Sequence, residues 1–164
     1  MHTIKKYLDE GSYEFKSIKE LMQSCEELPY EKGVYMVLRT SNDAPTFLKE
    51  GTGGFFKGKD PNVSIEELED NWIDDEPILY IGQTGGNGSS NTLQRRIRQN
   101  ILFGQGKNIG HYGGRYIWQL ADAAELLVCW KPLADNDPKQ VEEEMMQIFK
   151  QVHNGRRPFA NLIG

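Results

Sequence analysis

Pro77-Ile78-Leu79-Tyr80-Ile81-Gly82 is the stretch around which the other parts of the chain can be arranged. Its apolar, β-branched and aromatic residues stand between a proline and a glycine-rich loop, which is typical of a short buried strand that ends abruptly. A glycine at such an end lets a substrate backbone come close to a rigidly held phenol, here that of Tyr80. An earlier run, Gly33 to Leu38, has the same character and carries Tyr35 two residues after its glycine. The sequence therefore predicts two tyrosine-bearing strands.

A basic helix is predicted after the second strand, with Thr92 among its candidate caps. One face of this helix is apolar, through Leu93, Ile97 and Ile101. Arg96 lies beside that stripe, whereas Arg95 and Arg98 point further round. Arg96 is therefore expected at the edge of the core. The alternative is a surface arginine that is paired with an acid.

An acidic helix is predicted near the C-terminus, opened by Asp137-Pro138. Its predicted apolar stripe recurs at steps of four, three and four residues, through Val141, Met145, Ile148 and Val152. Three glutamates follow Val141, and Glu142 alone stands three, four and seven residues before Met145, Met146 and Phe149. The pattern thus directs Glu142 toward the apolar margin.

A carboxylate directed inward is costly unless something binds it. A magnesium or manganese ion is a natural partner for Glu142, because hard divalent cations accept one or two protein carboxylates and complete their shell with water and phosphate. An arginine at the core edge would satisfy the same carboxylate. The sequence leaves both partners open.

These motifs, in this order, resemble the GIY-YIG nuclease family. The two motifs that name the family occur here as Gly33-Val34-Tyr35 and Tyr80-Ile81-Gly82. The later elements of the family are matched by Arg96-Ile97, Glu142 and the tail Pro158 to Asn161. The resemblance implies an α/β (α+β) fold with a small central antiparallel three-stranded sheet flanked by helices. It also implies cleavage of nucleic-acid phosphodiester bonds with one Mg²⁺ or Mn²⁺ ion.

The resemblance also implies roles for single residues. Glu142 would anchor the metal ion, and Arg96 would offset charge on the phosphorus. Tyr35 would orient or deprotonate the attacking water, Tyr80 would contact the phosphate or the water, and Asn161 would orient groups near the site. A tyrosine base must have its pKa lowered from about 10 to work at neutral pH.

Two departures from the family pattern weaken the proton-transfer step. Asn100 stands where the family usually has histidine or tyrosine, and Gln83 stands where it often has lysine. His111 or Tyr112 would have to fold back to replace them. Two alternatives to an active nuclease follow, a catalytically weak or inactive nucleic-acid-binding module and a protein-interaction domain.

The length of 164 residues predicts one domain, residues 1–164, with a helical extension at residues 1–27 and an insertion at residues 41–76 between the two motif strands. The remaining predicted elements are a helix from near Ser17 to before Pro29, a helix capped by Ser64 with Glu67 completing a capping box, a strand or edge at Arg115 to Leu120, and a buried strand at Leu126 to Trp130.

The net charge of −5 is unevenly distributed along the chain, in a way that is compatible with a nucleic-acid partner. Residues 1–76 hold 17 acids and 9 bases, whereas residues 77–164 hold 7 acids and 10 bases. Cys25 and Cys129 stand far apart, which gives no support to a zinc site or a disulfide framework. We expect a cytoplasmic protein that has no membrane partner, acts on DNA rather than RNA, and takes specificity from a partner protein if it has one.

Overall fold

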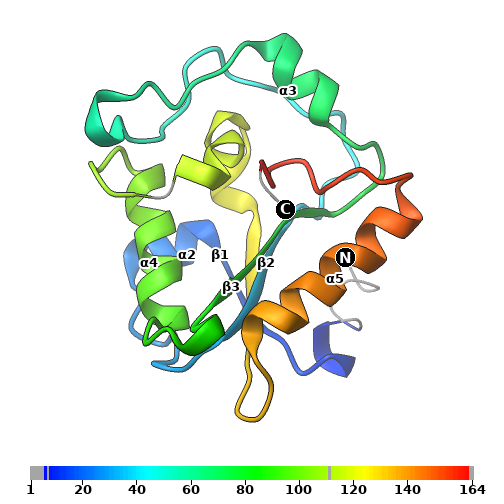
Figure 1. The fold of residues 1–164 in the computed structure, drawn as a ribbon. Helices are drawn as coiled ribbons and strands as arrows, with labels where there is room; N and C mark the ends of the chain where they lie inside the picture. Colours follow the sequence, from blue (N-terminus) through cyan, green and yellow to red (C-terminus); the bar gives the residue numbers. More distant parts are fainter. Residues whose placement is uncertain (1–5, 7, 111, 163–164) are drawn as a thin grey trace.

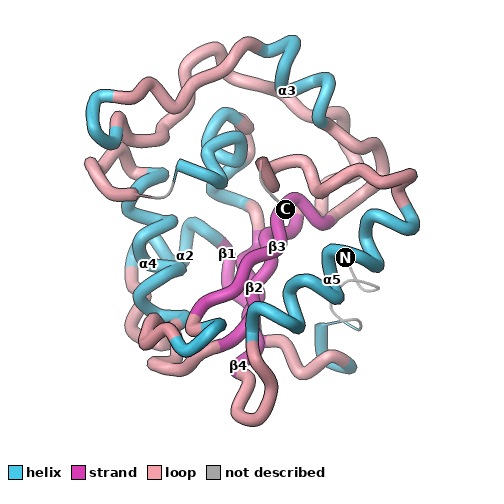
Figure 2. The backbone as a smooth tube through the Cα atoms, viewed as in Figure 1, coloured by secondary structure: helices cyan, strands magenta, loops and turns pink. Residues whose placement is uncertain are grey.

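The computed structural model describes residues 6, 8–110 and 112–162, which form a mixed α/β fold around one antiparallel sheet (Figures 1 and 2). The four strands lie in the order β1-β4-β2-β3. The strands are β1 (Glu14–Ser17), β2 (Gly33–Leu38), β3 (Ile78–Thr84) and β4 (Leu127–Pro132). The α-helices are α2 (Ile18–Gln23), α3 (Ile65–Asn71), α4 (Leu93–Gly104) and α5 (Pro138–Val152). The 3₁₀ turns are η1 (Phe56–Gly58), η2 (Gly86–Gly88), η3 (Tyr112–Gln119) and η4 (Ala123–Glu125).

The two predicted tyrosine strands are neighbours in the sheet. β2 runs antiparallel to β3, with Tyr35 opposite Gly82, and antiparallel to β4 on its other side, with Tyr35 opposite Trp130. Every residue of β2 is buried, as expected for the centre of a sheet covered on both faces. β3 is an edge strand, so the site that it carries can open to solvent.

The expectation of three strands was wrong, because β1 adds a fourth at the far edge of the sheet. Its four residues pair with β4, Glu14 opposite Trp130 and Ser17 opposite Leu127. The stretch is short and none of its residues is fully buried, so it lacks the apolar pattern of a strand. Its pairing partner lies more than a hundred residues away, which local sequence does not reveal.

Helices cover both faces of the sheet, so that the chain has two cores (Figure 1). On one face, α2 and α4 pack on the side of β2 that bears Tyr35 and Val37. On the other face, α5 packs through Met146 and Phe149 against Met36 and other residues of that side. The two helices that carry Arg96 and Glu142 therefore lie on opposite sides of the strand that carries Tyr80.

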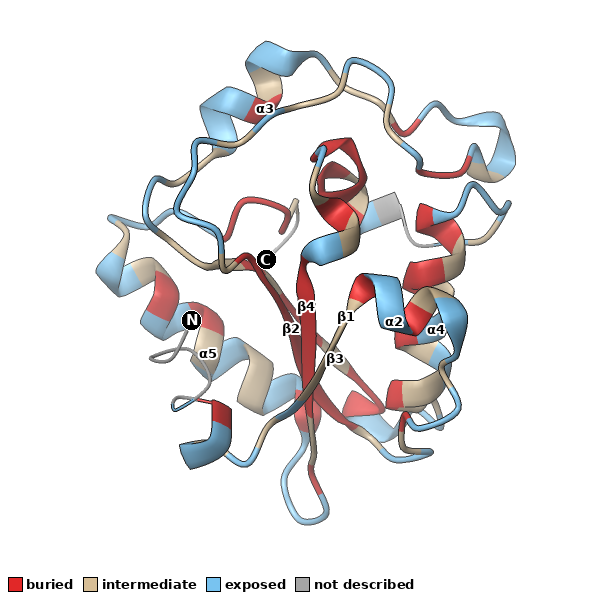
Figure 3. Cartoon of the chain, turned by 180° about the vertical axis from the view of Figure 1, so that it is seen from behind, coloured by how far each residue is buried: buried red, intermediate tan, exposed pale blue. Residues whose placement is uncertain are grey.

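Residues 39–77, which connect β2 to β3, form a long arch above the sheet (Figure 3). Its two ends meet where the Arg39 amide donates to the Pro77 carbonyl, at 2.8 Å. The buried side chain of Gln119 fastens its interior, accepting from the Val63 amide and donating to the carbonyls of Leu48 and Val63. The arch is thus a packed part of the domain.

Several local predictions were confirmed and others need correction. The caps Thr92 and Ser64 accept hydrogen bonds from the third residue of their helices, as predicted. Glu67, however, does not complete a capping box, because its carboxylate accepts the Tyr116 hydroxyl instead. The predicted helix before Pro29 ends already at Gln23.

The segment from Arg115 to Leu120 forms 3₁₀ turns, with a strand-like bridge only between Phe47 and Leu120. On α5, the buried stripe runs through Met146 and Phe149, whereas Ile148 and Val152 of the predicted stripe are 63% and 72% exposed. Among the described residues, no helix combines the length and the apolar character that crossing a bilayer requires.

Candidate active site

Four of the five predicted site residues gather at the edge of the sheet formed by β3. The rings of Tyr35 and Tyr80 lie 5.9 Å apart between centroids, at an interplanar angle of 35°. Arg96 of α4 lies within hydrogen-bonding reach of both phenols, and the charge of Glu142 on α5 acts on Tyr80. The charges of Arg96 and Glu142, which come from two different helices, therefore both act on Tyr80.

Gly82 makes room for the buried phenol of Tyr35. A Cβ atom at Gly82 would lie 2.5 Å from Cζ and 2.7 Å from the hydroxyl oxygen of Tyr35, closer than any side chain tolerates. Because Tyr35 and Gly82 are register partners, the ring of the first motif lies across the glycine of the second. Tyr35 is only 1% exposed, whereas Tyr80, Arg96 and Glu142 are partly exposed.

The guanidinium of Arg96 keeps an uncompensated positive charge. Burial alone lowers its pKa, but the neighbouring phenols of Tyr35 and Tyr80 outweigh burial and raise the pKa of Arg96. Within the described part of the chain, no carboxylate forms an ion pair with it. The alternative of a surface arginine paired with an acid is therefore wrong, and the charge remains available to an anion.

Tyr80 stays protonated at ordinary pH. The adjacent Tyr35 phenol and then burial raise the pKa of Tyr80 far above its usual value of 10, and Arg96 only partly offsets them. This shift is opposite to the one that a tyrosine base needs. Tyr80 is therefore a hydrogen-bond donor and not a proton acceptor in this arrangement.

Glu142 is a partly buried carboxylate with no cationic partner in direct contact among the described residues. Burial, and next the charge of Glu143, raise its pKa, while Lys139 partly offsets them. The alternative of a carboxylate neutralised by a core-edge arginine is thus not what the structure shows. Such a desolvated carboxylate fits an external cation.

The donor set around Glu142 fits a cation that keeps most of its water. The described residues contain no group of three or more histidine, cysteine or acidic side chains able to enclose a metal ion. Mg²⁺ is commonly held by one or two carboxylates, with water and substrate phosphate at its remaining positions. A single half-buried carboxylate whose charge acts on Tyr80, itself a neighbour of Arg96, is compatible with that mode.

The loop after β3 holds the first turn of α5 in place, a feature that the sequence did not predict. The side-chain oxygen of Gln83 accepts from the Gly86 amide at 3.1 Å, and Asp137 accepts from the Asn87 amide at 2.8 Å. A Cβ at Gly86 would lie 2.7 Å from that of Lys139, so the two segments touch. Gln83 thereby helps to bring the α5 turn that bears Glu142 to the end of β3.

Asn161 lies beside the cluster and is bonded to the backbone. Its amide accepts from the Ile81 amide and donates to the Ile81 carbonyl, each at 2.9 Å. The Ala160 amide also donates to the Leu79 carbonyl. The tail therefore pairs with the open edge of β3, and Asn161 positions the strand that carries Tyr80.

Asn100 is buried on the same side of α4 as Arg96, one turn further on, and its side-chain oxygen has no hydrogen-bond partner. It cannot take up a proton in place of the family's histidine or tyrosine. His111 and the side chain of Tyr112, which could replace it, lie outside the described part of the chain.

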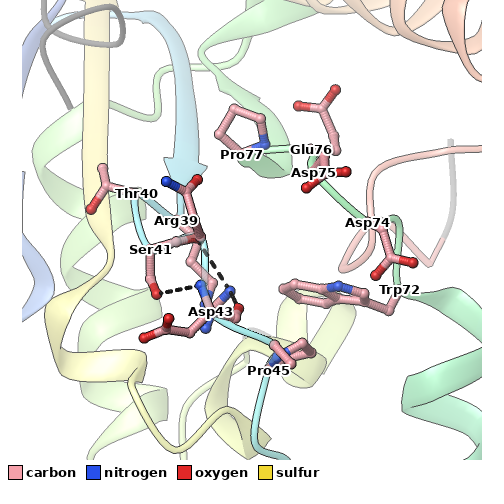
Figure 4. Close-up of a pocket in the computed structure, with 12 residues that line it drawn as sticks. Arg39, Thr40, Ser41, Asp43, Pro45, Trp72, Asp74, Asp75, Glu76 and Pro77 are labelled. Atoms are coloured by element: carbon pink, nitrogen blue, oxygen red, sulfur yellow. Dashed lines mark hydrogen bonds between the residues drawn. The ribbon is translucent and has the colours of Figure 1, made fainter.

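A separate cavity of about 150 Å³ lies under the ends of the arch (Figure 4). Arg39 borders it, with its Nε donating to Asp122 at 2.8 Å and its guanidinium 5.4 Å from the ring centroid of Trp72. A carboxylate compensates the charge of this arginine. These contacts therefore account for its burial, and a ligand is not needed to explain it. None of the predicted site residues lines this cavity.

Comparisons of the chain with protein-family models, with curated proteins and with solved structures gave no match. Any assignment of function therefore depends on the residues described above.

Proposed function

We propose that the chain is a metal-dependent endonuclease that hydrolyses nucleic-acid phosphodiester bonds, DNA in preference to RNA, with a site similar to that of the GIY-YIG nucleases. The observation that carries the proposal is the gathering of an unpaired guanidinium, two phenols and an unpaired, partly buried carboxylate at one edge of the sheet. Phosphoryl transfer requires positioning and neutralisation of charge more than covalent assistance, and these groups can supply both.

The side chains divide the work according to their exposure and charge. Arg96 binds oxygens of the scissile phosphate and offsets the negative charge that develops there. Tyr80, which is partly exposed and protonated, donates a hydrogen bond to a phosphate oxygen or to the attacking water. Tyr35 is buried, so it holds Arg96 and Tyr80 in place and does not itself reach water.

Glu142 would hold the Mg²⁺ or Mn²⁺ ion. When bound, such an ion would act as a Lewis acid on the phosphate and the leaving oxygen. Asn161 contributes indirectly, because its two hydrogen bonds fix the backbone next to Tyr80.

A second candidate is a nucleic-acid-binding module without activity. It is favoured by one observation, the burial of Tyr35, which keeps the phenol expected to orient or deprotonate the attacking water away from solvent. The positive charge of Arg96 would serve binding equally well.

Incubation of the pure protein with single- and double-stranded DNA and RNA, with and without Mn²⁺ or Mg²⁺, tests the proposal. We expect metal-dependent nicking that is lost in both Glu142→Ala and Arg96→Ala. The exposed neighbours Glu143 and Arg95 provide matched controls, since alanine there removes the same charge outside the cluster. Salt-dependent binding without nicking would favour the binding module instead.

A further inference from the structure

A cationic pocket lies where the tail, η3 and the arch come together. Arginines from two elements line it, and Asn71 of α3, Tyr116 of η3 and Asn161 of the tail complete its wall. The arginines are Arg115 from η3, and Arg156 and Arg157 from the loop that follows α5. A concave surface that carries several guanidinium groups favours an anionic ligand.

Neutral acceptors hold two of these arginines in place. Arg156 donates to the backbone carbonyls of Asp70 and Trp72, at 3.1 and 3.3 Å. Arg157 donates to the carbonyl of Leu162, at 3.0 Å. Backbone carbonyls fix a guanidinium without cancelling its charge, and each guanidinium has further N–H groups to offer. The two side chains are therefore pre-organised and still cationic.

Among the described residues, Arg156 and Arg157 of the pocket have no acidic partner. The pocket lining includes no aspartate or glutamate, and no ion pair forms with Arg156 or Arg157 within the described part of the chain. One lining residue does contact an acid, since the carboxylate of Glu67 on the arch accepts the Tyr116 hydroxyl. The planar fork of a guanidinium matches phosphate oxygens, which makes a phosphate group the best-fitting ligand.

Asn161 connects this pocket to the candidate active site. This residue is part of the pocket lining, and its side chain bonds both polar groups of the Ile81 backbone, next to Tyr80. We propose that the pocket binds a backbone phosphate of the nucleic-acid strand, away from the scissile phosphate, and so guides the strand along the edge of β3 toward Tyr80, Arg96 and Glu142. This inference rests on the proposed function and adds a second phosphate contact to it.

The test is binding of fluorescent DNA and RNA oligonucleotides, measured by anisotropy at several salt concentrations in the presence of a chelator. We expect Arg157→Ala to weaken binding about 5- to 10-fold and to reduce the slope of log K against log salt by about one. Arg157→Lys should retain most of the slope, because it keeps the charge. Arg98→Ala, an exposed arginine on α4 that does not line the pocket, should leave the slope unchanged.

Thermal unfolding of each variant separates a loss of binding from a loss of folding. Arg157 is the preferred position, because Arg156 also ties down the end of α3. An unchanged slope in a folded Arg157→Ala protein would overturn the inference. A second result would also overturn it: Arg157→Ala loses binding of inorganic phosphate or a mononucleotide but binds oligonucleotides normally. The pocket would then serve a free phosphate compound.

The failure of this inference and that of the proposed function can be told apart, because binding is measured without metal. A reduced slope in a protein that never nicks its substrate would support the pocket and reject the nuclease. Normal nicking by Arg157→Ala with an unchanged slope would support the nuclease and reject the pocket.

Discussion

The two charged residues of the candidate site are held without partners of opposite charge. Arg96 has the phenols of Tyr35 and Tyr80 as its neighbours, and Glu142 is desolvated at the margin of α5. Such groups lower the stability of the free protein, since each would be better solvated or paired elsewhere. Strain of this kind is expected where side chains are kept ready for a ligand.

Replacing Glu142 separates stability from activity. Because burial raises its pKa above the unfolded value of about 4.5, the ionised carboxylate destabilises the folded state above the folded pKa, and the penalty disappears as the pH falls below the unfolded one. We expect Glu142→Gln to lower nicking about 100-fold or more and to raise the unfolding temperature at pH 7 by roughly 1–2 °C.

Calorimetry from pH 4 to pH 8 checks the sign of this effect. The advantage of Glu142→Gln over wild type should be full at pH 7 and shrink toward pH 4. Glu143→Gln, an exposed change on the same turn, should leave nicking intact. A Glu142→Gln protein that unfolds at a lower temperature at every pH would contradict the assignment.

At the scale of elements, local signals predicted those ends of helices that a single residue specifies. Thr92, Ser64 and Pro138 each begin a helix where their chemistry indicates, because capping depends on neighbours within one turn. The strand β1 was missed because only its distant partner β4 makes it a strand.

Parts of the candidate site followed from the sequence in the same way, and parts did not. Glu142 could be distinguished from Glu143 by the apolar residues that follow it on one helical face. The roles of Gln83 and Asp137 could not be predicted, since each bonds a backbone amide of a loop whose path depends on the tertiary fold. The exposure of Ile148 could not be predicted either, because it depends on which face of α5 packs on the sheet, and that face runs through Met146 and Phe149.

The contact between β2 and β3 predicts the effect of enlarging one glycine. In Gly82→Ala, the new methyl group would overlap the Tyr35 ring and displace it from Arg96 and Tyr80. We expect a loss of about 1–3 kcal/mol in unfolding free energy and a larger proportional loss of nicking. Denaturant unfolding and nicking assays measure both; Gly113→Ala, where no atom lies within 4 Å of the added Cβ, should change neither.

The pairing of the tail with β3 predicts the effect of removing one amide. Asn161→Ala leaves the Ile81 amide and carbonyl without partners in a buried place. We expect a destabilisation of about 1–3 kcal/mol, or roughly 3–10 °C in unfolding temperature. Hydrogen exchange at the Ile81 amide should accelerate. An unchanged exchange rate in that variant would mean that the tail does not secure this edge.

At the scale of the whole molecule, we expect the fold to form without a metal ion. Two apolar cores enclose the sheet, and the described residues offer no cluster of ligands that could hold a structural ion. We therefore expect EDTA to abolish nicking while changing the unfolding temperature by less than about 1 °C. Scanning calorimetry with and without chelator measures the shift; a drop of several degrees would indicate a metal bound within the fold.

The exposed turn at Gly58 lies on the arch between the two tyrosine strands, and nothing lies within 4 Å of an added Cβ there. Dividing the chain after Gly58 would leave Tyr35 on one fragment and Tyr80, Arg96 and Glu142 on the other. Neither fragment alone could assemble the phenol pair. Because β2 of the first fragment pairs with β3 and β4 of the second, the hydrogen bonds of the sheet would favour reassociation. Under the proposed function, we expect this turn to be a suitable place to split the nuclease, so that restored cleavage would report that two fused partners have met.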